Sequence, residues 1–235
     1  MRALILIALA ACTYDEKIFE GPYSCVGARP PATAPQLVTL GGTVRDPENL
    51  SPVIAASVQL QTAPTGSVIA STVTDLNGHF SFDVNTNGAP VTGLDIHISA
   101  TGFVDSYYFP SRPIAADIEL DIVSLLTTSE ASTLFSDAGL TMTSGDGHIL
   151  MSISDCNEMP LPGGTLASAP AGTIRYFNGI IPAQSATMTG PGGVVLDANL
   201  VPGNVTLTAM DDGHTYPQVQ VSVVANAFTV TDLQP

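Results

Sequence analysis

The sequence predicts an all-β protein, built from two tandem β-sandwiches that a short helical segment joins. Hydrophobic residues make up 45% of the chain, but 21 glycines and 18 prolines divide them into short runs. Many runs alternate apolar with polar residues, the pattern of a strand that buries one face. Turn residues separate the runs about every eight to twelve positions, as in a sandwich. A chain of 235 residues is long enough for two such domains.

Charge excludes one class of partner. The chain has 6 basic and 21 acidic residues, a formal net charge of -15 at pH 7. This charge would repel the phosphates of nucleic acids, so we expect no nucleic-acid partner. Acidity at this level serves solubility by itself, and an acidic recognition surface is the alternative.

The N-terminus has the features of an export signal. Arg2 precedes an apolar run that ends in Leu9-Ala10-Ala11-Cys12. The run matches a secretory signal and is too short to cross a bilayer, which needs about 20 apolar residues. Its end resembles the lipobox of bacterial lipoproteins, which implies a signal peptide over 1–11 and lipidation of Cys12. By the same resemblance, Thr13 implies the outer membrane. A buried apolar strand is the alternative.

Residues 12–36 would be the lipidated N-terminus and a tether. This segment is rich in proline and lacks a period, as in an extended spacer. Once Cys12 is lipidated, Cys25 and Cys156 are the remaining thiols in an oxidising compartment. We therefore predict a Cys25–Cys156 disulfide that clamps the tether to the second domain, with two free thiols as the alternative.

Residues 37–125 carry a frame of short strands and turns. Asp75 and Asn77 can cap their own turn, Gly78 supplies a positive φ, and Phe80 returns to the core. The frame consists of Gly42-Thr-Val-Arg-Asp46, Ala56-Ser-Val58, Thr74-Asp75-Leu-Asn-Gly78-His-Phe80 and Leu94 to Ala100. It resembles the carboxypeptidase regulatory-like domain, which implies a transthyretin-like, immunoglobulin-like sandwich of seven strands.

A divergent copy of the frame recurs over 146–235, for example at Gly147 to Asp155 and Val205 to Ala209. An internal duplication therefore predicts a second seven-stranded sandwich. Between the two domains, we predict that 126–145 is a linker with a short helix. Thr127-Thr-Ser-Glu130 has the form of a capping box that opens a helix, which Gly139 can close.

No motif for catalysis or for a cofactor occurs in the sequence. We expect no catalytic residue, no metal and no cofactor. The four histidines lie far apart, although a metal site assembled across strands is an alternative. Calcium is an alternative at Asp75 to Gly78 and at Asp211-Asp-Gly213, where turn chemistry is sufficient.

Two adjacent tyrosines are the candidate ligand-binding residues. Tyr107 and Tyr108 lie on an expected strand, where neighbouring side chains point to opposite faces. An exposed ring can stack on a sugar. In the alternative interpretation, Phe103, Tyr108 or Phe109 fills the core and Tyr107 is an ordinary edge residue.

These observations predict a non-catalytic cell-envelope lipoprotein, exported and anchored in the outer membrane, that acts as a surface-tethered binding or scaffolding module. The family resemblance implies the same, because such domains serve as accessory modules. Its partners would be membrane lipid, through the anchor, and a cell-envelope protein or glycan. The alternatives are a polysaccharide-binding lipoprotein and, more remotely, a cryptic hydrolase.

Overall fold

The computed structural model describes residues 21–29, 31–63 and 66–235. These residues contain sixteen strands, one α-helix and one 3-10 helix, so the predicted all-β class is confirmed. No helix among them is long and apolar enough to cross a membrane. The expected signal peptide, 1–11, and the lipidated Cys12 lie outside the described residues.

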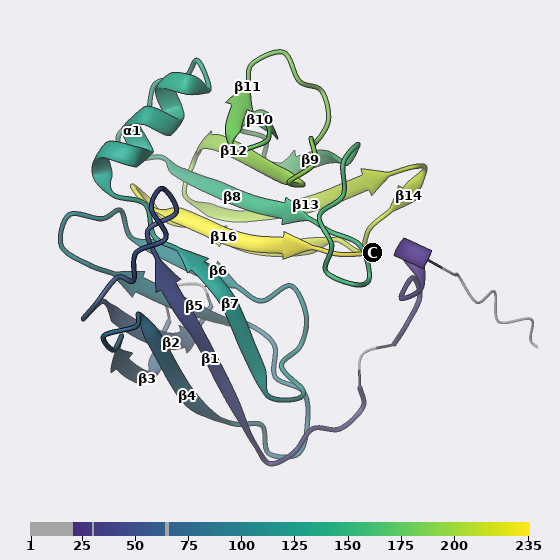
Figure 1. Cartoon of the computed structure of the whole chain (residues 1–235). Coiled ribbons are helices and arrows are strands. Elements are labelled where there is room, and N and C mark those ends of the chain that lie inside the picture. The colour runs from purple at the N-terminus through teal and green to yellow at the C-terminus, as the bar shows by residue number, and fades with distance from the viewer. Residues whose placement is uncertain (1–20, 30, 64–65) are drawn as a thin grey trace, which may run out of the picture.

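The first sandwich packs a three-stranded sheet of mixed direction against part of a nine-stranded sheet, around one core (Figure 1). In β4, alternation buries Phe80, Phe82 and Val84 and leaves the residues between them exposed. The predicted turn before β4 has Gly78 at φ +78°, where a Cβ would lie 2.5 Å from the carbonyl oxygen of Val44. The strands are β1 (Leu37–Arg45), β2 (Ser57–Thr62), β3 (Val68–Val73), β4 (His79–Asn85), β5 (Leu94–Ser99), β6 (Ser106–Phe109) and β7 (Ile118–Ser124).

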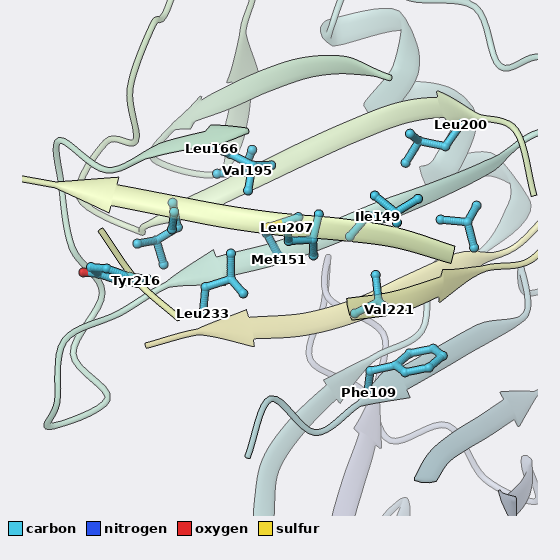
Figure 2. Packing of buried hydrophobic residues seen from close by; sticks show 14 of the residues in the cluster. Phe109, Ile149, Met151, Leu166, Val195, Leu200, Leu207, Tyr216, Val221 and Leu233 are labelled. Atoms are coloured by element: carbon cyan, nitrogen blue, oxygen red, sulfur yellow. The ribbon is translucent and has the colours of Figure 1, made fainter. Parts of the chain in front are cut away.

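The second sandwich has nine strands, which corrects the expectation of seven. Two hairpins, β10–β11 and β13–β14, account for the added strands. The strands are β8 (Gly147–Ile153), β9 (Thr165–Ala169), β10 (Thr173–Asn178), β11 (Ile181–Ala183), β12 (Val194–Leu200), β13 (Gly203–Asp211), β14 (His214–Thr215), β15 (Val219–Val223) and β16 (Phe228–Leu233). Figure 2 shows Ile149, Met151, Val195, Leu207 and Val221 between its two sheets.

One sheet runs through both sandwiches, whereas the sequence predicted two sandwiches joined only by a helical segment. Its nine strands follow the order β11-β10-β12-β8-β16-β6-β5-β2-β3. The last strand, β16, lies between the sandwiches and pairs in parallel with β6 on one side and β8 on the other (Figure 1). The hydroxyl of Thr231 also donates to the carbonyl of Phe109 at 2.9 Å. Because backbone hydrogen bonds cross the boundary, the sandwiches form a continuous structure.

Helix α1 (Thr128–Asp137) covers the face of this sheet that the second sandwich leaves open. The predicted capping box is present: the Thr127 side chain accepts from the Glu130 N–H, and the Glu130 carboxylate accepts from the Thr127 N–H. Phe135, 2% exposed, packs with Phe177 and Phe228 of the sheet. The helix therefore contributes to a third core.

Candidate functional site

The candidate site is the place where the N-terminal tether meets the second sandwich. Cys25 and Cys156 form a disulfide across 131 positions of sequence, so the predicted bond is confirmed. The N–H of Cys156 donates to the carbonyl of Pro22 at 2.9 Å. Asp155 shapes the turn that presents Cys156, since its carboxylate accepts from the N–H groups of Asn157 and Met159 at 2.7 and 2.9 Å.

A tyrosine in the tether adds a second attachment beside the disulfide. Tyr23 ends the 3-10 helix η1 (Gly21–Tyr23), and its hydroxyl donates to Asp211 Oδ2 at 2.5 Å. Its ring stacks on His214, with centroids 4.0 Å apart and an interplanar angle of 16°. Burial, the Asp211 hydrogen bond and nearby carboxylates raise the pKa of Tyr23, so its phenol stays a donor. We call Tyr23, Cys25, Cys156, Asp211 and His214 the tether clamp.

Beneath the tether clamp lies a buried phenol. Tyr216 is 2% exposed, and its hydroxyl has no hydrogen-bond partner within the part of the chain that the structure describes. Burial, followed by the charges of Asp211 and Asp155, raises the pKa of Tyr216 to about 12. The phenol is therefore neutral at physiological pH and supplies no general base.

A hollow of 290 Å³ adjoins the clamp at the junction of the two sandwiches. The guanidinium of Arg112 lies 3.8 Å from the sulfur of Cys25. Its neighbour Ser111 donates to Asp232 of β16 at 2.9 Å. The loop after β6 thus links the first sandwich to both the tether and the last strand. The hollow is lined by Val91 to Leu94, Pro110 to Ile114 and Gln218 to Gln220.

The two predicted ligand-binding tyrosines point to opposite sides of the shared sheet. Tyr107 is 8% exposed and belongs to the core of the second sandwich. Tyr108 is half-buried against the core of the first sandwich, and its hydroxyl lies 3.4 Å from Asp232. Both rings lie against cores, whereas stacking on a sugar needs an exposed ring face.

Sequence reasoning missed a stack between Tyr107 and a histidine of the neighbouring strand. His97 of β5 stacks on Tyr107 of β6 with centroids 4.4 Å apart, and His97 Nε2 lies 3.1 Å from Asp105 Oδ2. The β5–β6 register places His97 directly opposite Tyr107. No spacing in the sequence indicates this contact, because it depends on which strands pair.

The described residues contain no group of three or more histidine, cysteine, aspartate or glutamate side chains that could hold a metal ion. Each histidine has its own structural neighbours. They include Glu119 at 3.5 Å from His79, Asp105 beside His97, the N–H of Asn199 that donates to His148, and Tyr23 stacked on His214.

Comparison with known proteins identifies no family. No protein-family model matches the sequence, and no curated protein matches it. Two similar solved structures are the Bacillus anthracis TIE protein and the shaft pilin SpaA of Lactobacillus rhamnosus GG. The first is 13% identical with a TM-score of 0.29, over 83% of this chain and 33% of that one. The second is 9% identical with a TM-score of 0.26, over 87% of this chain and 98% of that one.

A third similar structure is an enzyme, the 3-chlorocatechol 1,2-dioxygenase of Rhodococcus opacus. It is 12% identical with a TM-score of 0.30, over 43% of this chain and 63% of that one. The chain thus spans about a third of the Bacillus anthracis protein and 63% of the dioxygenase. Likeness at this level assigns neither a family nor an activity.

Proposed function

We propose that this chain is a non-catalytic cell-envelope lipoprotein that acts as a surface-tethered binding or scaffolding module. The observation that carries the proposal is the Cys25–Cys156 disulfide, which joins the tether covalently to the second sandwich. Disulfides form and persist in the oxidising compartments that exported proteins reach. The disulfide of the tether clamp therefore supports an exported location for this chain.

The path of the tether fits this role. From the disulfide, the tether runs along the molecule to the far end of the first sandwich, where β1 begins (Figure 1). There the N–H of Ala34 donates to the carbonyl of Gly88 at 3.0 Å, and the N–H of Thr86 donates to the carbonyl of Gln36 at 3.0 Å. A pull on an anchor at Cys12 would therefore reach the second sandwich through Cys156 before it reached β1.

The remaining assignments follow from the sequence. We propose a signal peptide over 1–11, a lipidated Cys12 that binds membrane lipid, and outer-membrane residence. We also propose a carboxypeptidase regulatory-like domain over 37–125, a linker over 126–145 and a divergent sandwich over 146–235. A cell-envelope protein or glycan would be the partner. The core positions of Tyr107 and Tyr108 favour scaffolding over polysaccharide binding.

Expression of the full chain in a bacterial host tests the proposal. We expect the wild-type protein to gain a diacylglyceryl-type mass at its N-terminus and to partition with membranes, and Cys12→Ala to do neither. The control is the double variant Cys25→Ser and Cys156→Ser, which should be lipidated as in the wild type. A wild-type chain that keeps an unmodified N-terminus and stays in the aqueous fraction would refute the lipoprotein assignment.

A further inference from the structure

The two edges of the shared sheet differ in how they are protected. At one edge, β11 has three residues, and its middle residue, Pro182, has no N–H to offer another strand. At the other edge, β3 has six residues and contains neither a proline nor a charge. β3 is the last strand of the shared sheet, beyond β2 (Figure 1). Strands of this kind pair with other chains unless something covers them.

The outer face of β3 is apolar. Ile69 and Val73 are 53% and 62% exposed and flank the exposed Ser71. Side chains two residues apart share one face of a strand, so these three form a row beside the open edge. The register with β2 is regular from Val73 to Ala70. It is irregular between Ala70 and Val68, where Ile69 has no paired residue in β2.

Backbone groups of the same residues point away from the sheet. The N–H of Thr74 donates to the carbonyl of Ala56 at 3.0 Å, and the carbonyl of Thr74 accepts from Ala55 at 3.1 Å. The backbone of Thr74 therefore faces the β2 side. Because this direction alternates along an antiparallel strand, the N–H and carbonyl groups of Val73 and Ser71 face the open edge.

We propose that two copies of this chain associate through β3, antiparallel, about a two-fold axis at Ser71. In this register Ser71 lies opposite its own copy, and the two residues exchange two backbone hydrogen bonds. Val73 then lies opposite the second copy's Ile69, which forms two equivalent apolar pairs. The surface is self-complementary, as an isologous two-fold interface must be.

Charge favours a second copy at this edge over other surfaces of the molecule. Each copy has a formal net charge of -15, so most approaches bring carboxylates together. No acidic residue occurs from Gly66 to Thr74. Asp75, the next carboxylate, would lie opposite Ser67 of the second copy and already accepts from the N–H groups of Asn77 and His79. Added salt should strengthen the association, since it screens the remaining repulsion.

Sedimentation equilibrium of the full chain, in a detergent matched in density to the solvent, tests this pairing. We expect a reversible dimer that tightens with salt. Ile69→Lys and Val73→Glu should each raise the dissociation constant about tenfold or more, since each disrupts two cross-strand pairs. The matched control is Ile181→Lys on the protected edge, where the side chain is 55% exposed. It should leave the dissociation constant unchanged.

An equimolar mixture of the two single variants tests the register. In the mixed dimer the introduced lysine faces the introduced glutamate, and the other pair is wild type, so association should recover. Recovery also shows that both variants fold. A parent chain that stays monomeric overturns the proposal. That result is expected if the β3 edge pairs only with a strand of another protein. A mixture that stays monomeric, or an Ile181→Lys effect equal to that of Ile69→Lys, overturns it as well.

Discussion

The backbone N–H of Asn199 donates to His148 Nδ1 at 3.2 Å, in a site where the histidine is only 1% exposed. Since Nδ1 accepts, the neutral ring carries its proton on Nε2. The ring packs against Phe135 and Phe228, with centroids 4.6 and 5.3 Å away. Burial lowers the pKa of His148 to about 4. Burial between the helix and the shared sheet therefore disfavours the charged imidazolium.

This burial predicts a loss of stability in mild acid. The histidine has a pKa near 6.5 in the unfolded state. Below that pH the unfolded state therefore binds a proton, whereas the folded histidine stays neutral. The contribution of His148 to the free energy of unfolding should be fully present above about pH 6.5. It should be lost as the pH falls towards 4, by about 3 kcal/mol in total. Urea unfolding across this range measures it. His148→Gln, which keeps a side-chain acceptor but does not titrate, should show a shallower dependence.

Asp197 should change the free energy of unfolding with pH in the opposite direction, so the comparison with His148→Gln is necessary. It is fully buried in β12, and desolvation raises its pKa, so acid relieves a cost that its carboxylate imposes on the folded state. Only the difference between wild type and His148→Gln isolates the histidine. Equal pH dependence in the two proteins would contradict the assignment to His148.

The helix cap predicts a second, local effect. Thr127→Ala removes the acceptor for the Glu130 N–H, at 3.1 Å, and should lower the free energy of unfolding by about 1 kcal/mol. Ser132→Ala is the control, because Ser132 is exposed in the middle of the same helix. Denaturant unfolding of both variants decides the matter. Equal effects would mean that the cap contributes nothing beyond the propensity of the helix.

Local signals predicted the local features. The Thr127 and Glu130 spacing identified the helix start, and the alternation of Phe80 and Phe82 identified a half-buried strand. Elimination among three cysteines identified the disulfide. Each of these inferences depends on residues that lie near one another in sequence or on the number of thiols.

The sequence did not predict which distant strands pair. Nothing in Phe228 to Leu233 indicates that this strand joins β6 to β8, because its alternation is compatible with any neighbour. The same strand pairing explains the burial of Tyr107, one of the two candidate ligand-binding tyrosines, because β16 pairs with the strand that carries it. The polar contacts of Tyr23 and His97 depend in the same way on long-range packing.

The disulfide predicts a large change in global stability. In the chain-entropy model, a closed loop of this length contributes roughly 4–5 kcal/mol by restricting the unfolded chain. The double variant Cys25→Ser and Cys156→Ser should lower the free energy of unfolding by that order. Intact mass with and without reductant shows whether the bond is present in the sample. Cys12→Ala is the control and should leave unfolding unchanged, since it removes no cross-link.

Tyr23 predicts how the tether behaves when the disulfide is intact. Tyr23→Phe keeps the ring that stacks on His214 but removes the donor to Asp211, which is 8% exposed and loses its partner at 2.5 Å. A hydrogen bond to a charged group contributes about 1.5–3 kcal/mol, so the tether should open more often. Amide exchange over 21–29 should accelerate about tenfold or more, because exchange there follows local opening. Tyr176→Phe removes a buried hydroxyl that accepts from the N–H of Leu166 at 3.0 Å, and it should leave exchange in the tether unchanged. Unaltered exchange in Tyr23→Phe would mean that the disulfide alone holds the tether.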